Sequence, residues 1–146
     1  MNDQPAPAAP GASAGLGRRL GSLCYETLLL AAILFISGWA FLAVGRMLDP
    51  MLARPLLQLC LLAVSAVYFV YCWTHGGQTL PMKTWRIRLV ARNGGAVTPG
   101  TGIYRYLFAL IGFGLCGLGL AWALFDRDRQ FLHDKLAGTR LMRIED

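Results

Sequence analysis

Residues 27–45 form an apolar run without a single charged side chain, and this run most constrains what the chain can fold into. As a helix, 19 residues are long enough to cross about 30 Å of hydrocarbon. The run starts directly after an acid, Glu26, and Arg19 stands seven residues before that acid. A charged side chain costs about 2.5–3.5 kcal/mol at the bilayer centre and less near the surface. The sequence therefore predicts a membrane helix with a polar site at one end.

Two further apolar runs, 56–73 and 107–125, set the size of the membrane part. The 146 residues are 55% hydrophobic and only 15% charged, which is typical of a small membrane bundle. The connector 46–55 is short, so the first two helices must form an antiparallel hairpin, and Pro55 suits the first position of the second helix. We expect an all-α membrane protein with membrane segments at about 20–45, 55–73 and 106–125, and a small cytoplasmic β cap.

The third run is rich in glycine and leaves two alternatives open. It contains Gly112, Gly114, Gly117 and Gly119. Glycine at this density permits close packing of a spanning helix, and it also permits a break into a re-entrant hairpin. The two alternatives place the C-terminal tail on opposite sides of the membrane.

The polar cap is expected from two separate stretches, 74–102 and 126–146. Residues 85–89 alternate apolar and basic side chains, which indicates a half-buried strand. Asn93, Gly94 and Gly95 predict a reverse turn with a short return arm. Residues 139–144 form a second strand-like segment that can pair with 85–90 only if both lie on one side of the membrane.

The distribution of basic residues predicts the orientation. They concentrate before the first run, between the second and third runs, and in the tail, whereas the first connector carries only Arg46 and Arg54. The positive-inside tendency then places both termini and the cap in the cytoplasm of a multi-pass inner-membrane protein. Residues 1–17 are rich in Pro, Ala and Gly, lack the order of a signal peptide, and are expected to form a disordered tail before a domain at 18–146.

Several function classes find no support in the sequence. The basic residues flank apolar runs without the pattern of a nucleic-acid surface, although the formal net charge is +6. No CxxC pair and no spaced histidine motif indicates a metal, and no nucleotide or hydrolase motif indicates a cofactor or a catalytic site. We therefore expect neither an enzyme nor a metal or cofactor site, and the lipid bilayer is the expected partner.

Several short motifs together resemble the RDD family of bacterial integral membrane proteins. They are Gly17-Arg18-Arg19-Leu20 with the acid Glu26, Gly76-Gly77-Gln78-Thr79-Leu80, Met82-Lys83, Arg105, and the stretch 125–139 around His133-Asp134. The resemblance covers about 18–143. The family's arginine matches Arg19, its first aspartate matches Glu26, and its second is aligned with Asp134. Glutamate at 26 lengthens the side chain, and Pro81 stands where members commonly carry glycine.

The resemblance implies a cytoplasmic-membrane protein of unsettled molecular function, with ion or solute transport suggested for some members. Arg19, Glu26 and Asp134 form the predicted charged cluster. Arg19 and Glu26 are expected to make an ion pair or a proton-binding element, or else to anchor the first helix and bond a neighbouring segment. Asp134 is expected to be a buried partner of Arg19, Arg105 or a strand backbone. The supporting candidates are Arg105, Asp126, His133 and Gln78.

Two functions follow as alternatives. The first is a component of ion, proton or small-solute movement that uses Glu26, Arg19 and Asp134. The second is a non-transporting structural or accessory subunit whose charged residues only lock the fold. One copy encloses too little for a pore, so transport requires a homo-oligomer or a membrane partner.

Overall fold

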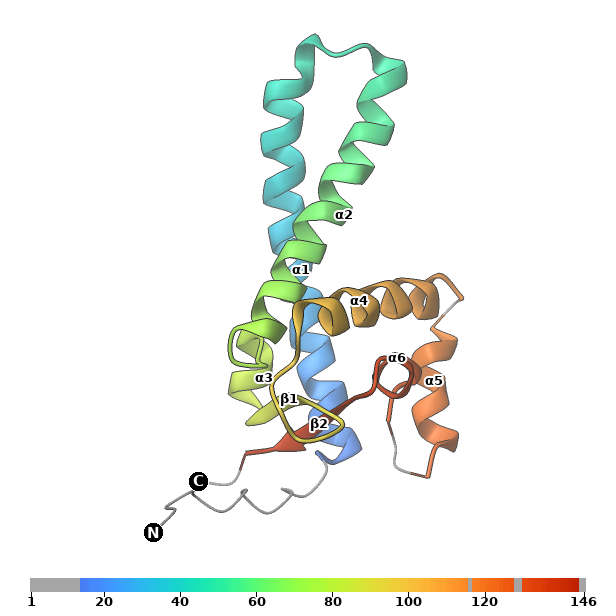
Figure 1. Ribbon diagram of the computed structural model, residues 1–146. Coiled ribbons are helices and arrows are strands. Elements are labelled where there is room, and N and C mark those ends of the chain that lie inside the picture. Colours follow the sequence, from blue (N-terminus) through green and yellow to red (C-terminus); the bar gives the residue numbers. More distant parts are fainter. Residues whose placement is uncertain (1–13, 116, 128–129, 145–146) are drawn as a thin grey trace.

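Two long antiparallel helices stand above a small mixed cap in the computed structural model, which describes residues 14–115, 117–127 and 130–144 (Figure 1). Helix α1 spans Leu16–Val44, a short 3-10 turn η1 covers Gly45–Met47, and helix α2 spans Pro50–Thr74. Both helices are long and apolar enough to cross a membrane. Large apolar side chains such as Leu28, Phe35 and Trp39 are more than 60% exposed along α1. This hairpin confirms the first two predicted helices.

Helix α2 begins earlier than predicted because Asp49 and Pro50 start the helix ahead of the apolar run. The side chain of Asp49 accepts a hydrogen bond from the Met51 backbone N–H at 2.8 Å, and Pro50 occupies the first helical position. Pro55 therefore lies inside the helix, and its assignment to the first position of the helix is wrong.

The first residues of the described chain also differ from the prediction. Ala14 is buried, and its backbone N–H donates to the Leu141 carbonyl at 3.2 Å. The predicted disordered tail 1–17 is thus too long, because α1 already starts at Leu16; residues 1–13 of that tail lie outside the described part.

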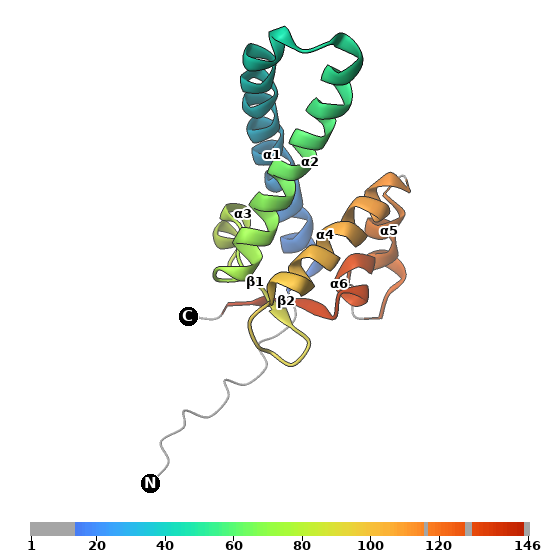
Figure 2. The ribbon, with the colours of Figure 1, turned by 45° about the horizontal axis from the view of Figure 1, so that its top comes forward.

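The predicted strand pairing is confirmed. Strand β1 (Ile87–Ala91) pairs antiparallel with β2 (Thr139–Arg143), with Leu89 opposite Leu141. A turn at Gly94 follows β1, but among the described residues the sheet has two strands, so the expected return arm is wrong. The strands and the short helices α3 (Leu80–Thr84) and α6 (Leu132–Leu136) gather at one end of the hairpin (Figure 2).

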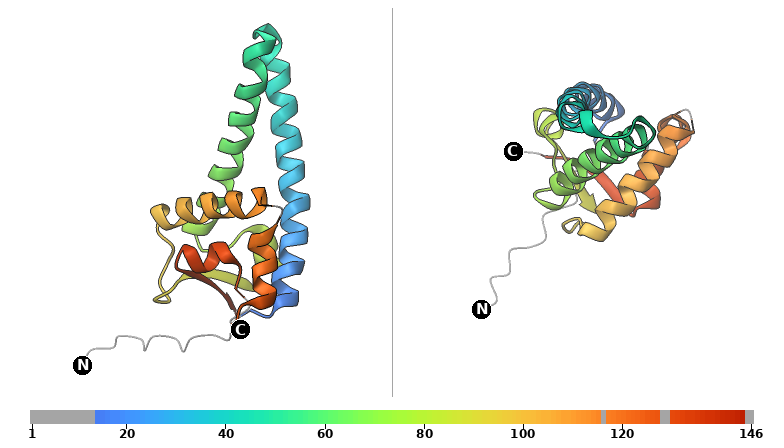
Figure 3. Two further views of the ribbon diagram at one scale, coloured as in Figure 1. Left: turned by 90° about the vertical axis from the view of Figure 1, so that its right-hand side faces the viewer. Right: turned by 90° about the horizontal axis from the view of Figure 1, so that it is seen from above.

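The third apolar run is broken into two helices. Helix α4 spans Pro99–Gly114 and helix α5 spans Leu118–Phe125, separated at Gly117, which has a φ of +76°. Figure 3 shows α4 lying across the direction of the hairpin and α5 turning back towards the cap. A single spanning helix over 107–125 is wrong because glycine allows this left-handed turn. The membrane placement of α4 and α5 stays a prediction.

The start of α4 also corrects the position of Arg105. Thr98 caps the helix by accepting from the Thr101 N–H, and Pro99 follows, so the helix begins well before the apolar run. Arg105 therefore lies in the second turn of α4 and is buried. The apolar core lies where α2, α4 and the sheet meet, and includes Trp73, Ile87, Leu89, Tyr106 and Phe131. The buried core thus sits at the cap end of the hairpin.

Candidate functional site

Glu26 is buried at the junction of three elements. It lies in α1 with 6% of its surface exposed. Its Oε1 accepts a hydrogen bond from the Tyr68 hydroxyl of α2 at 2.8 Å, and its Oε2 accepts from the Thr79 hydroxyl. Thr79 also caps α3, since its hydroxyl accepts from the Met82 N–H at 3.4 Å. Glu26 therefore joins the hairpin to the cap through two hydroxyl groups.

Arg19 is buried near Glu26 in the sequence but bonds a different part of the molecule. Its Nε donates to the Ala14 carbonyl at 2.7 Å, and its Nη2 donates to the Leu141 carbonyl of β2 at 3.4 Å. Among the described residues Glu26 bonds hydroxyls of α2 and of the segment before α3, so of the two expected alternatives the structure shows the bond to a neighbouring segment and not an Arg19–Glu26 ion pair. Two helical turns separate the residues by about 10 Å along the axis, and each side chain reaches its own neighbour.

Asp134 forms a buried ion pair with Arg105, one of the partners that the sequence predicted. The Asp134 side chain is fully buried, and the Arg105 side chain is 3% exposed. Nη1 of Arg105 donates both to Asp134 and to the Thr139 hydroxyl, the latter at 2.8 Å. These bonds link α4, α6 and β2. The charged groups thus hold the C-terminal segment against the start of α4.

One side of the Arg105 guanidinium has no acceptor. Among the described residues none accepts a hydrogen bond from Nε or Nη2, although Nη1 is doubly engaged. The guanidinium carbon lies 4.8 Å from the centre of the Trp73 ring, and the Trp73 Nε1 is also buried without an acceptor in the described part. Two neighbouring side chains therefore each present a donor that is unsatisfied.

His133 is buried and neutral at pH 7. Its ring stacks on Phe131 with 5.5 Å between centroids, and its Nε2 lies 3.6 Å from Oδ1 of Asp134. Burial lowers the pKa of His133 to about 4, against the opposing effect of Asp134. At pH 7 this residue therefore adds no positive charge to the site.

The other two supporting residues have structural contacts. Asp126 accepts from the Gln130 N–H at 3.2 Å and from the Lys135 Nζ at 2.8 Å, so it ties the end of α5 to α6. Gln78 donates from Nε2 to the Ile87 carbonyl at 2.8 Å and fixes the entry to the cap. Within the described ranges, no three side chains of His, Cys, Asp or Glu gather as metal ligands would.

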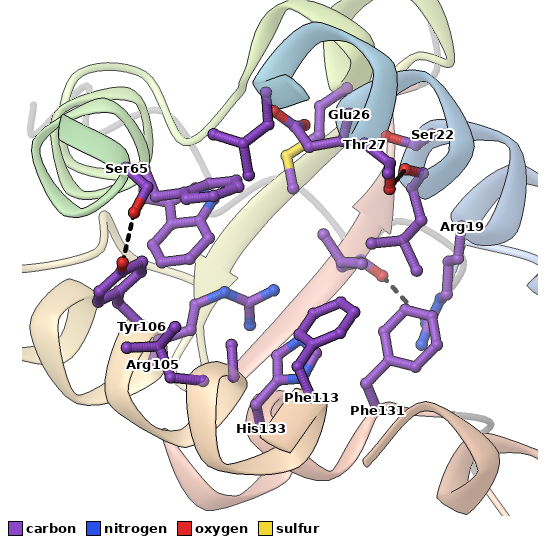
Figure 4. Close-up of a pocket in the computed structure, with 18 of the residues that line it drawn as sticks. Arg19, Ser22, Glu26, Thr27, Ser65, Arg105, Tyr106, Phe113, Phe131 and His133 are labelled. Atoms are coloured by element: carbon purple, nitrogen blue, oxygen red, sulfur yellow. Dashed lines mark hydrogen bonds between the residues drawn. The ribbon is translucent and has the colours of Figure 1, made fainter. Parts of the chain in front are cut away.

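Several of the candidate residues line one cavity of about 340 Å³ between α1, α4 and the cap. Arg19, Glu26, Arg105 and His133 are among its most buried lining residues, each less than 9% exposed, and we call this buried part of the cavity its base. Figure 4 shows the Arg105 guanidinium projecting into the space between α4 and α1. Asp134, Asp126 and Gln78 are not among the lining residues. The structure thus brings Arg19 and Glu26 to one cavity without pairing them.

Four polar residues of this region were missed from the sequence as site residues. Tyr68 and Thr79 bond Glu26, and the hydroxyls of Ser65 and Tyr106 bond each other across the α2–α4 contact. A signal existed for Thr79, since a threonine two residues before Pro81 is typical of a helix N-terminus. A tyrosine near the end of an apolar helix and a lone serine within one give no sign of their partners.

Comparison with known proteins identifies a family. The model of the RDD family matches residues 13–138, which covers all of the elements above except β2. Among curated proteins and among solved structures, none matches the chain.

Proposed function

The chain belongs to the RDD family of membrane proteins, and on that premise we propose that it binds a small solute or ion in the cavity at the cap end of its hairpin and takes part in moving it across the membrane. The observation that carries this proposal is the location of Glu26 and the kind of partner it bonds. A carboxylate at the end of a membrane helix lines a cavity of about 340 Å³ and bonds only neutral hydroxyls in the described part. Ionisable residues in such positions commonly mark ion and solute pathways.

The proposed orientation places the cap and both termini in the cytoplasm of the inner membrane. The cap end carries Arg18, Lys83, Arg88 and Arg92, whereas the opposite end of the hairpin carries Arg46 and Arg54. Figure 1 supports this arrangement because the cap, the start of α1 and the end of β2 lie at one end of the hairpin. The positive-inside tendency favours the cytoplasm for the side with more basic residues.

Transport by this fold requires more than one subunit. The described chain has two helices of spanning length, which are too few to surround a path through the bilayer. Their exposed apolar faces leave room for lipid or for helices of other copies or of a membrane partner. We therefore propose an oligomer or a complex as the working state.

The test is a flux assay in proteoliposomes that compares the wild type with Glu26→Gln. We expect the wild type to move at least one of H⁺, Na⁺ or K⁺ faster than protein-free liposomes, or to move a small solute from a matched screen. The Glu26→Gln variant keeps the size of the side chain, removes its charge and replaces one acceptor oxygen by an amide NH₂, and it should lose at least ten-fold in flux. Asp49→Asn in the exposed turn is the matched control and should keep wild-type flux.

Wild-type flux no higher than that of empty liposomes would contradict the proposal. If the Glu26→Gln variant shows the same flux as the wild type, Glu26 is not part of the transport pathway.

A second candidate function is a non-transporting accessory subunit. It is favoured by the fact that the bonds of Glu26 and of Arg105 each join separate elements, as structural clamps do. In that case Glu26→Gln lowers the melting temperature in detergent, while the wild type shows no flux for any solute tested.

A further inference from the structure

The cavity has a charged base and an apolar opening. At the base, Arg19 and Arg105 are 1% and 2% exposed. Towards the opening, α1 contributes Leu30 and Leu34, and α4 contributes Leu110 and Phe113, of which Phe113 is 55% exposed. These side chains come from a spanning helix and from the helix that lies across it (Figure 3). A molecule that fills this cavity therefore meets charge at one end and hydrocarbon along the rest.

The base offers hydrogen-bond donors that the protein itself does not use. Nε and Nη2 of Arg105 have no acceptor among the described residues, and neither does Nε1 of Trp73. Both side chains line the cavity and are at least nine-tenths buried. Buried donors are rarely left without an acceptor in a folded protein, because the loss of hydration is not repaid. The arrangement calls for an acceptor group at the base of the cavity.

The charges around the cavity and its open donors together indicate the kind of acceptor. Arg19 and Arg105 contribute two positive charges and Glu26 one negative charge. His133 is neutral near pH 7 because burial lowers its pKa to about 4. Asp134 is not a lining residue, but its carboxylate neutralises the charge of Arg105. With Arg105 paired to Asp134, the charges of Arg19 and Glu26 balance each other, so the open N–H groups of Arg105 and Trp73 are what favour the head group. Arginine N–H groups bind carboxylate and phosphate oxygens well.

We propose that the cavity binds a single-chain anionic amphiphile, with its carboxylate or phosphate head at Arg105 and Trp73 and its hydrocarbon chain between α1 and α4. The volume of about 340 Å³ suits a small ligand. The inference rests on the proposed function in that it names the class of solute for the same cavity. A free inorganic anion fits less well, because the apolar side chains at the opening offer no hydrogen bonds to replace the hydration that the anion loses.

The test measures equilibrium binding to the purified full-length protein in a neutral detergent, with native mass spectrometry to count bound molecules. The probes are palmitate, hexadecanol as the chain without charge, and inorganic phosphate as the charge without a chain. We expect palmitate to bind one to one, and both other probes to bind at least ten-fold more weakly.

Three variants test separately how the head group and the hydrocarbon chain of the ligand contribute to binding. Trp73→Phe keeps the ring and removes its N–H, Arg105→Lys keeps the charge and removes the planar donors, and Ala109→Phe narrows the cavity. Each should weaken palmitate binding at least five-fold. Trp39→Phe, at an exposed position of α1, is the matched control and should bind as the wild type does. If Arg105→Lys does not fold, Trp73→Phe and Ala109→Phe still decide the question.

The remaining outcomes either overturn the inference or identify the source of the ligand. Equal binding of hexadecanol indicates a merely apolar cavity, equal binding of phosphate indicates a site for the ion alone, and no binding of any probe indicates a cavity that holds water; each overturns the inference. If a lysophospholipid with a phosphate head displaces palmitate, the ligand comes from the membrane, whereas displacement by fatty acids alone indicates a free amphiphile, and both support it. Flux without palmitate binding would contradict this inference alone, and binding without flux would contradict the transport proposal alone.

Discussion

Buried charges in this protein bond residues from other elements. Arg105 of α4 contacts Asp134 of α6 and Thr139 of β2, and Glu26 of α1 contacts Tyr68 of α2 and Thr79 before α3. The polar groups around the cavity therefore also hold separate segments of the fold together. A ligand that binds at such a place meets side chains that the fold already holds in position.

Loss of the Asp134 charge should destabilise the cap strongly. Asp134→Asn keeps the shape of the side chain but leaves the buried guanidinium of Arg105 without its counter-charge. Breaking a buried ion pair on one side typically costs about 3–5 kcal/mol. We expect the melting temperature in detergent micelles to fall by roughly 10 °C. Asp49→Asn is the control, because asparagine caps a helix about as well as aspartate, and an equal effect of both substitutions would contradict the account.

Acid should destabilise the protein through His133. Its pKa is about 4 in the folded state and near 6.5 when unfolded, so the unfolded chain binds the proton first as the pH falls. Stability from the neutral imidazole is therefore present above pH 6.5 and is lost as the pH falls towards 4, by on the order of 3 kcal/mol.

The comparison that isolates this effect uses His133→Phe, which preserves stacking on Phe131 and removes the titrating group. Its melting temperature should depend less on pH between 6.5 and 4 than that of the wild type. His75→Phe, at an exposed histidine, controls for the loss of an imidazole. Identical pH profiles for the wild type and His133→Phe would show that His133 is not the group responsible.

At the scale of elements, apolar length and alternation were sufficient to predict the hairpin and the strand pair. The helix starts were wrong where a cap and a proline lie outside the apolar run, at Asp49-Pro50 and at Thr98-Pro99. The break at Gly117 was one of two alternatives, because composition cannot tell close packing from a left-handed turn. The partners of Glu26 were not predictable, since residues 42 and 53 positions away meet only when the cap folds onto the hairpin.

The approach of the cap loop to β1 depends on Gly77. Its φ is +71°, and a Cβ at this position would clash with the carbonyl oxygen of Leu89. This oxygen belongs to the backbone of β1 and cannot turn away as a flexible side chain could. Gly77→Ala should therefore cost about 1–2 kcal/mol for the backbone conformation and about 1–3 kcal/mol more for the displacement of β1.

Gly94→Ala is the matched variant, because Gly94 has a similar φ of +84° and open space around it. Thermal unfolding should show a clearly larger loss for Gly77→Ala than for Gly94→Ala. Equal losses would mean that the loop and β1 do not approach each other as described.

At the scale of the whole molecule, the described chain divides into a hairpin with exposed apolar faces and a cap that contains the buried core. The charged base of the cavity lies at the junction of these two parts. This division explains why the charged residues of the family resemblance, although far apart in sequence, collect at one end. With the cap and both termini proposed to be cytoplasmic, our central proposal is that α1 and α2 alone cross the membrane and that α4 and α5 stay on the side of the cap.

The most direct test of this claim is the accessibility of single cysteines to a membrane-impermeant maleimide. Cys24, Cys60, Cys72 and Cys116 are first replaced by serine, and one cysteine is then introduced as Met47→Cys, Arg92→Cys or Arg127→Cys. The account predicts that Met47→Cys is labelled in intact cells, whereas Arg92→Cys and Arg127→Cys are labelled only in inverted membrane vesicles. Labelling of Arg127→Cys from the same side as Met47→Cys would show that the segment 99–125 crosses the membrane, and would contradict the account.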